Sequence, residues 1–119
     1  MGVIYTTTVG YGFQVSEKRL RKLDAERYEE DGPFEMLDKF LHDYPDLDYA
    51  WAGNAYKGYE GGFIVFLKSH SHSVDVYGVQ KVAESGPSDK KARAQLVNAA
   101  QKIGERKSGV GWFVASSVG

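Results

Sequence analysis

The sequence contains no cysteine, which excludes a disulfide framework, a zinc finger and a thiol nucleophile. Proline is also scarce, with 3 residues in 119, and we find neither an internal repeat nor a low-complexity tract. The longest purely apolar run is Phe63 to Leu67, whereas a membrane-spanning helix needs about 20 apolar residues. We therefore expect no membrane partner.

An excess of charge of one sign is missing too, since 15 Lys and Arg residues face 16 Asp and Glu residues. A formal charge of −1 gives the whole chain no strong attraction to nucleic acid or to anionic membranes. The hydrophobic fraction of 42% and the charged fraction of 26% are typical of soluble globular proteins, and they exclude collagen and a wholly disordered chain. The length predicts one domain over residues 1–119.

The N-terminal residues lack the basic start and the apolar stretch of a secretory signal, so we expect a cytoplasmic location. Residues 1–6 do fit the loose myristoylation pattern, in which a threonine follows four places after Gly2. The same residues have the composition of a first strand, which is the interpretation we favour.

Composition and polarity patterns predict strands over residues 3–15, 47–51, 63–67, 74–79 and 110–118. A first helix follows the capping residue Ser16, a second runs from Pro33 to Tyr44, and a third runs from Ser88 to Ile103. Gly10 and Gly12 indicate a bulge or a break in the first strand, and residues 69–73 indicate a hairpin turn.

The fold class is therefore predicted as α+β, with a mixed, mainly antiparallel sheet of about five strands. Three helical segments cover one face of this sheet, since each has one apolar stripe that must be buried. A ferredoxin-like split βαβ is the nearest named arrangement. Leu37 on the second helix and Phe66 on the third strand are expected in the core.

Aromatic residues alternate with polar residues on several predicted strands. Helices that cover one face of a sheet leave the other face open, so we expect exposed rings there. Tyrosine and tryptophan supply rigid, amphipathic contact area for a partner, a nucleic-acid base or a second copy of the chain. The predicted platform consists of Tyr5, Tyr49, Trp51 and Tyr77.

Charge is unevenly distributed along the chain. Residues 24–48 carry ten acids against Arg27 and Lys39, a local net charge of −8. Residues 88–108 carry six bases against Asp89 and Glu105, a local net charge of +4. The candidate basic segments are Lys18, Arg19, Arg21 and Lys22 on the first helix, with Lys90, Lys91 and Arg93 on the third. Such segregation predicts an acidic pole and a basic pole that steer charged partners.

His70 and His72 could share one face of a strand and bind a metal ion, with His42, Asp43 or Asp75 as a third ligand. The pair could also act as acid and base in phosphoester hydrolysis, although His42 is not followed by the Ser or Thr that a second motif of that class requires. We favour two solvated histidines in a polar turn, and we expect no metal, no cofactor and no catalytic residue.

The stretch from Lys57 to Phe66 resembles the signature of the RNA-recognition motif, in which glycines alternate with aromatic residues. Two additional residues, Glu60 and one glycine, change the strand register, so that the aromatic side chains would not share one face. We interpret the stretch as a glycine-rich loop that leads into a core strand.

The preferred hypothesis is a small, non-catalytic protein–protein interaction or homo-oligomeric accessory module, of the kind found in bacteria and their viruses. Its partner would be another protein or a second copy of the chain. One alternative is a nucleic-acid or nucleotide binder that uses the sheet aromatics and the basic segments. The second alternative is a histidine-dependent metal or phosphoester hydrolase.

Overall fold

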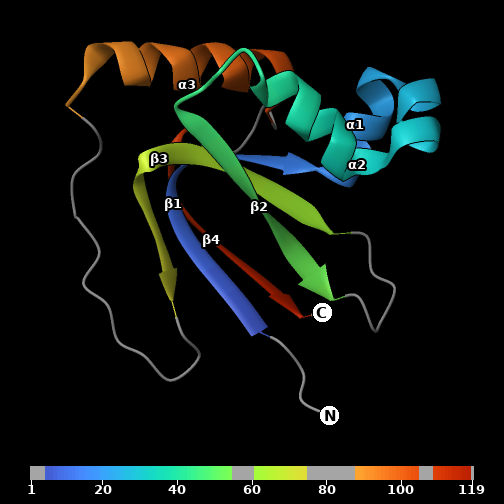
Figure 1. The fold of residues 1–119 in the computed structure, drawn as a ribbon, viewed down its shortest axis with the longest axis horizontal. Helices are drawn as coiled ribbons and strands as arrows, with labels where there is room; N and C mark the ends of the chain where they lie inside the picture. Colours follow the sequence, from blue (N-terminus) through green and yellow to red (C-terminus); the bar gives the residue numbers. More distant parts are fainter. Residues whose placement is uncertain (1–4, 55–60, 75–87, 105–108, 119) are drawn as a thin grey trace.

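The computed structural model describes residues 5–54, 61–74, 88–104 and 109–118 of the chain. The elements follow in the order β1 (Tyr5–Ser16), α1 (Glu17–Leu23), α2 (Ala25–Leu41), β2 (Leu47–Asn54), β3 (Gly62–Val74), α3 (Lys90–Ile103) and β4 (Gly111–Val118). The three helices lie together on one side of the sheet, as the amphipathic patterns predicted (Figure 1). The α+β class is confirmed.

The described strands form one mixed sheet in the order β4-β1-β3-β2. Neighbours in this order are antiparallel, and the sheet curls until its edge strands β2 and β4 meet in parallel at Gly53–Ser117 and Asn54–Val118. The curled sheet is a small closed barrel. The ferredoxin-like arrangement is not confirmed, because it implies an open sheet and this one closes on itself.

The expectation of about five strands is wrong for the described residues, which form four. Residues 69–73, predicted as a hairpin turn, lie inside β3, where Ser71 pairs with Gly10 and Ser73 with Thr8. Their polarity suggested a turn, but the backbone of β1 supplies their ladder partners. The register against β1 shifts between Gly10 and Gly12, as the two glycines predicted. Residues 75–79 of the predicted fourth strand lie outside the described residues.

Side-chain caps begin each helix. Ser16 accepts a hydrogen bond from the Arg19 backbone N–H, as predicted for the first helix. An unpredicted break follows at Asp24, which ends α1 and caps α2 through the Arg27 backbone N–H. The predicted break at Gly32-Pro33 is confirmed as a kink inside α2, where Gly32 adopts a φ of 81° that favours glycine.

Two hydrophobic cores lie on opposite faces of the sheet. The larger one lies between the sheet and the helices and includes Leu37, Leu96 and Phe63. The smaller one lies on the barrel's inner side and consists of Ile64, Phe66 and Ala115, with alanines and Phe113 around them. Leu37 and Phe66 are both buried, as predicted.

Small residues allow four strands to close around such a narrow interior. A methyl group at Gly10 would lie only 2.7 Å from the Cβ of Phe66, so this ring packs directly on the β1 backbone. Within the described part of the chain, no helix has the length and apolar character needed to cross a membrane.

Candidate functional site

Two of the four predicted platform residues, Tyr49 and Trp51, lie on the helix-covered face of β2 rather than on an open face. Both are half-buried and pack against the larger core. The prediction of an open face is wrong for them, because residues 47, 49 and 51 share the face that α2 covers. The side chain of Tyr5 and all of Tyr77 lie outside the described residues.

Phe34 on α2 completes an aromatic cluster with these two residues. Its ring centroid lies 6.2 Å from those of Tyr49 and Trp51 and 5.3 Å from that of Phe63. Yet 47% of Phe34 is exposed. The kink at Gly32 starts a new helical segment here, and Phe34 stands in its first turn. The cluster therefore presents aromatic surface to solvent.

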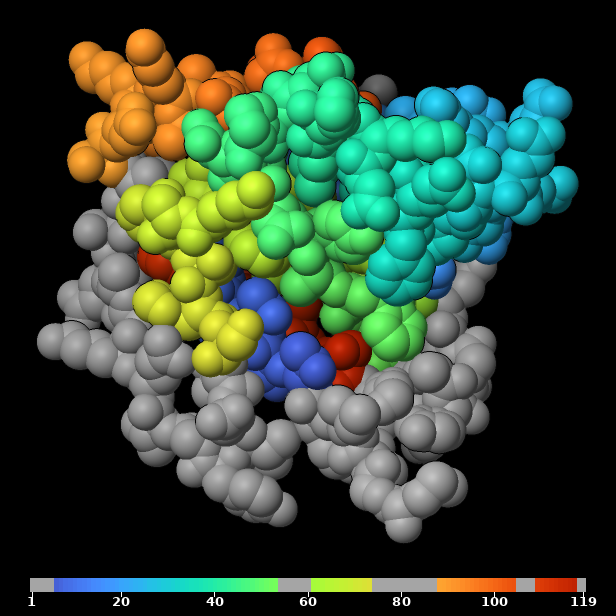
Figure 2. Space-filling model, viewed as in Figure 1, coloured from blue at the N-terminus to red at the C-terminus, as the bar shows by residue number. Residues whose placement is uncertain are grey.

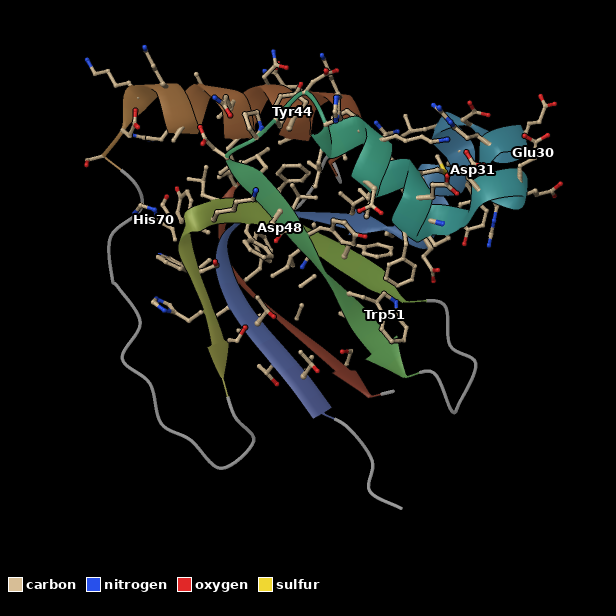
Figure 3. All side chains as sticks on the ribbon, in the orientation of Figure 1. Glu30, Asp31, Tyr44, Asp48, Trp51 and His70 are labelled. Carbon is tan, nitrogen blue, oxygen red and sulfur yellow. The ribbon has the colours of Figure 1, made fainter. Side chains whose placement is uncertain are left out.

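Carboxylates lie beside this cluster. Asp38 lies beside the Tyr49 hydroxyl, and Glu35 follows Phe34 on α2. Asp48 precedes Tyr49 on β2, so its side chain belongs to the other face of the strand, although its charge still acts on Tyr49. We name the surface formed by Phe34, Tyr49, Trp51, Glu35 and Asp38 the acidic–aromatic face. Helix α2 and strand β2 adjoin on the surface of the molecule (Figure 2), and Asp48 and Trp51 lie along β2 (Figure 3).

Glycines make room for the indole of Trp51. A Cβ at Gly53 would lie 2.6 Å from the indole ring, and a Cβ at Gly61 would overlap its nitrogen. Gly61 is also held in place, because its N–H donates to the Glu17 carboxylate while the Glu17 N–H donates to its carbonyl at 3.4 Å. The glycines that flank residues 55–60 thus position a ring of the acidic–aromatic face.

The environment of Tyr49 raises its pKa to about 12. Partial burial is the largest cause, followed by a hydrogen bond to Asp38 and by the charges of Asp38 and Asp48. The hydroxyl also lies 3.4 Å from the Phe34 carbonyl oxygen, which is a second acceptor for its one hydrogen. Tyr49 therefore stays neutral and holds the helix segment against β2.

The cations of α2 are engaged with other acids. Arg27 lies 3.5 Å from Asp31, and Lys39 bridges Asp31 at 3.2 Å and Glu35 at 3.5 Å. Asp31 is the main cause that raises the pKa of Lys39. Among the described residues, no cation forms an ion pair with Asp38 or Asp48. Negative charge at the aromatic rings is thus available to a partner.

A hollow of about 540 Å³ continues the acidic–aromatic face along α2. It is lined by Arg27, Glu35, Asp38, Lys39 and His42. It combines two carboxylates of the face with the paired cations just described, and it is large enough to receive a long polar side chain.

The two predicted basic segments do not form one strip. Lys90, Lys91 and Arg93 are exposed at the start of α3, while the other segment is the short helix α1 (Figure 1). These segments occupy opposite ends of the helical layer. On α1, Lys18, Arg21 and Lys22 are exposed, Arg19 is half-buried, and the Arg21 guanidinium lies 4.8 Å above the Tyr28 ring.

The histidines lie on β3 and not in a turn, which corrects that prediction. His70 exchanges a 2.8 Å hydrogen bond with the Ser69 hydroxyl, and its ring centroid is 6.5 Å from that of Trp112. His72 pairs with Val9 of β1. In the part of the chain that the structure describes, no three His, Asp or Glu residues lie close enough together to hold a metal ion. Asp75 lies outside that part.

An apolar cavity of about 340 Å³ lies between α1, α2 and the end of α3. Its lining includes Leu20, Leu23, Met36, Phe40 and Ile103, and its charged members are Asp24, Arg27 and Lys39. Asp24 caps α2, and the other two form the ion pairs with Asp31. The described lining contains no histidine, serine, threonine or tyrosine.

Sequence reasoning thus identified Tyr49 and Trp51 but missed Phe34 and Asp38 as their neighbours. The available signal was the Gly32-Pro33 break, which restarts the helix immediately before Phe34. No protein-family model, no curated protein and no solved structure matches this chain, so the geometry above stands as the basis for a functional assignment.

Proposed function

We propose that the protein is a non-catalytic interaction module whose acidic–aromatic face binds a cationic segment of a partner protein. The observation that carries this proposal is the exposed Phe34 ring beside Tyr49, Trp51 and the carboxylate of Asp38, with which no cation of the described residues forms an ion pair. Arginine and lysine combine a long apolar stem with a charged end, so one such side chain can contact the rings and the carboxylate together.

Each part of the face contributes to recognising such a side chain. A cation over an aromatic ring gains about 0.5–2 kcal/mol, depending on its exposure. A guanidinium also donates two parallel hydrogen bonds to one carboxylate, which fixes its orientation.

Charge favours a basic peptide over nucleic acid at this face. Phosphates would meet the carboxylates of Glu35 and Asp38, and like charges brought together lower affinity. The basic segments that could attract phosphates lie at the two ends of the helical layer, away from one another.

A calorimetric titration with a deca-arginine peptide tests the proposal. We expect binding to the wild type, and a loss of affinity of about tenfold in Phe34→Ala, because one cation–π contact disappears. Val97→Ala is the matched control, since Val97 is similarly exposed at 45% but lies on α3. The control should bind as the wild type does.

Charge neutralisation gives a second comparison. The double variant Glu35→Gln with Asp38→Asn should bind the peptide more weakly, and this binding should depend less on salt concentration. Glu26→Gln with Glu29→Gln removes the same charge from the first segment of α2 and should have a smaller effect. Equal losses in both double variants, or a single-stranded DNA that binds more tightly than the peptide, would contradict the proposal.

A further inference from the structure

All 31 charged side chains of the protein lie between residues 17 and 107, so the first 16 and the last 12 residues carry none. These two charge-free ends are not separate in space. They form β1 and β4, which pair over eight consecutive positions from Tyr5–Val118 to Gly12–Gly111. The fold thus brings the uncharged ends of the chain together into one two-stranded surface.

The outward side chains of this surface are identified by the alternation along β4. Phe113 packs toward the smaller core and Ala115 belongs to it, so Trp112, Val114 and Ser116 point to the outer side. Their partners across the ladder are Tyr11, Val9 and Thr7. We name the surface formed by Thr7, Val9, Trp112, Val114 and Ser116 the uncharged face.

Val114 is 63% exposed, which is more than any other exposed large apolar residue of the described chain. It lies opposite the half-buried Val9, and the next pair is joined by a 3.1 Å hydrogen bond between the Thr7 and Ser116 hydroxyls. At the other end, Trp112 meets the Tyr11 ring edge-on at 5.5 Å. Branched apolar, aromatic and hydroxyl groups therefore form a continuous strip.

The backbone of β4 is also incompletely paired. On the side away from β1, only Ser117 and Val118 have ladder partners within the described residues. Residues 111–116 contain neither a charge nor a proline.

We propose that the uncharged face is the interface of a homodimer, in which a second copy packs the same strip of β1 and β4 against its own. A two-fold dimer needs a surface that complements itself, and an uncharged strip does so without opposing like charges. The net charge of −1 adds little long-range repulsion between copies. A charged peptide or a nucleic acid would find no counter-charge on the strip.

This interface is distinct from the acidic–aromatic face, because it belongs to β1 and β4 whereas the other belongs to α2 and β2. Dimerisation therefore goes beyond the proposed function, and either can fail without the other. A dimer would carry two acidic–aromatic faces and could engage a partner with two basic segments at higher avidity.

Sedimentation velocity over a dilution series of the full chain tests the interface. We expect a species of twice the 13.2 kDa chain mass that dissociates on dilution. Val114→Lys should weaken the dimer by at least about 100-fold, because it places an unpaired ammonium in the contact. Ser116→Arg, at a second exposed position, should act in the same direction.

Val97→Lys is the matched control, since it introduces the same charge at a similarly exposed valine of α3. It should leave the dimer intact. A wild type that stays at 13.2 kDa at the highest soluble concentration would overturn the proposal. The proposal would also be overturned if Val97→Lys disrupted the dimer while Val114→Lys and Ser116→Arg left it intact.

Discussion

The acidic–aromatic face and the uncharged face both expose apolar side chains, but they differ in what surrounds those side chains. Phe34 lies on the same face as Glu35 and Asp38, whereas Val114 lies near hydroxyls, an indole and another valine. Carboxylates select a cationic partner and make its binding dependent on salt. A strip without charge makes no such selection, and its association depends on shape and apolar area.

The two faces also rest on different cores. The acidic–aromatic face packs on the core between the sheet and the helices, through Phe63 and the residues around Leu37. The uncharged face is the outer side of strands whose inner residues pack against Phe66 and Ala115. Substitutions in one core should therefore disturb one face before the other, which the following predictions use.

The largest expected effects come from truncating the centre of each core. Phe66→Ala should lower the free energy of unfolding by about 3–5 kcal/mol and Leu37→Ala by about 2–5 kcal/mol, because each leaves a cavity. Denaturant melts measure both losses. Leu37→Ala should lower the affinity for the deca-arginine peptide more than it weakens dimerisation. Phe66→Ala should weaken dimerisation more than it lowers the affinity for the peptide. A loss below about 1 kcal/mol for either would show that its core is misplaced.

A smaller effect is expected from adding a side chain to the closely packed interior of the barrel. Gly10→Ala places a methyl group 2.7 Å from the Cβ of Phe66, and such overpacking costs about 1–3 kcal/mol. Gly111→Ala is the control on β4, where a Cβ would have no neighbour within 4 Å. Thermal or denaturant melts should separate the two variants. Equal losses would mean that Phe66 does not pack on β1 as described.

The smallest effect concerns pH and the acidic–aromatic face alone. The pKa of Tyr49 rises from 10.0 in the unfolded chain to about 12 in the fold, so the folded state binds this proton more tightly. The resulting stabilisation is complete below pH 10 and is lost as the pH rises from 10 to 12. Tyr49→Phe should lose less stability over that range than the wild type does.

Denaturant melts at several pH values between 9 and roughly 12 would measure this difference. Lys39 titrates at high pH as well, since Asp31 raises its pKa, but it is present in both proteins and cancels in the comparison. Identical pH profiles for the two proteins would show that the fold does not raise the pKa of Tyr49.

Local signals in the sequence predicted much of the fold. Ser16 and the Gly32-Pro33 break mark helix boundaries through their own side chains and backbone preferences, so they are readable without tertiary structure. Residues 69–73 are the opposite case: they join β3 because the backbone of β1 pairs with them, and no local property of these polar residues indicates that partner.

The candidate sites follow the same division. Tyr49 and Trp51 lie on one strand, so alternation alone places them on one face. Phe34 and Asp38 reach them only because α2 packs across β2, which is a tertiary contact. Both ends of the sequence visibly lack charged residues, but they form one uncharged face only because β1 pairs with β4.

The chain has 2 tryptophans, and each face contains one, so fluorescence of two single-tryptophan variants tests most directly whether the faces act separately. Trp112→Phe reports on Trp51, and Trp51→Phe reports on Trp112. We predict that deca-arginine changes the emission of Trp51 but not of Trp112, and that dilution through the dimer–monomer range changes Trp112 but not Trp51. The account would be contradicted if the emission of both tryptophans changed on adding the peptide and also on dilution.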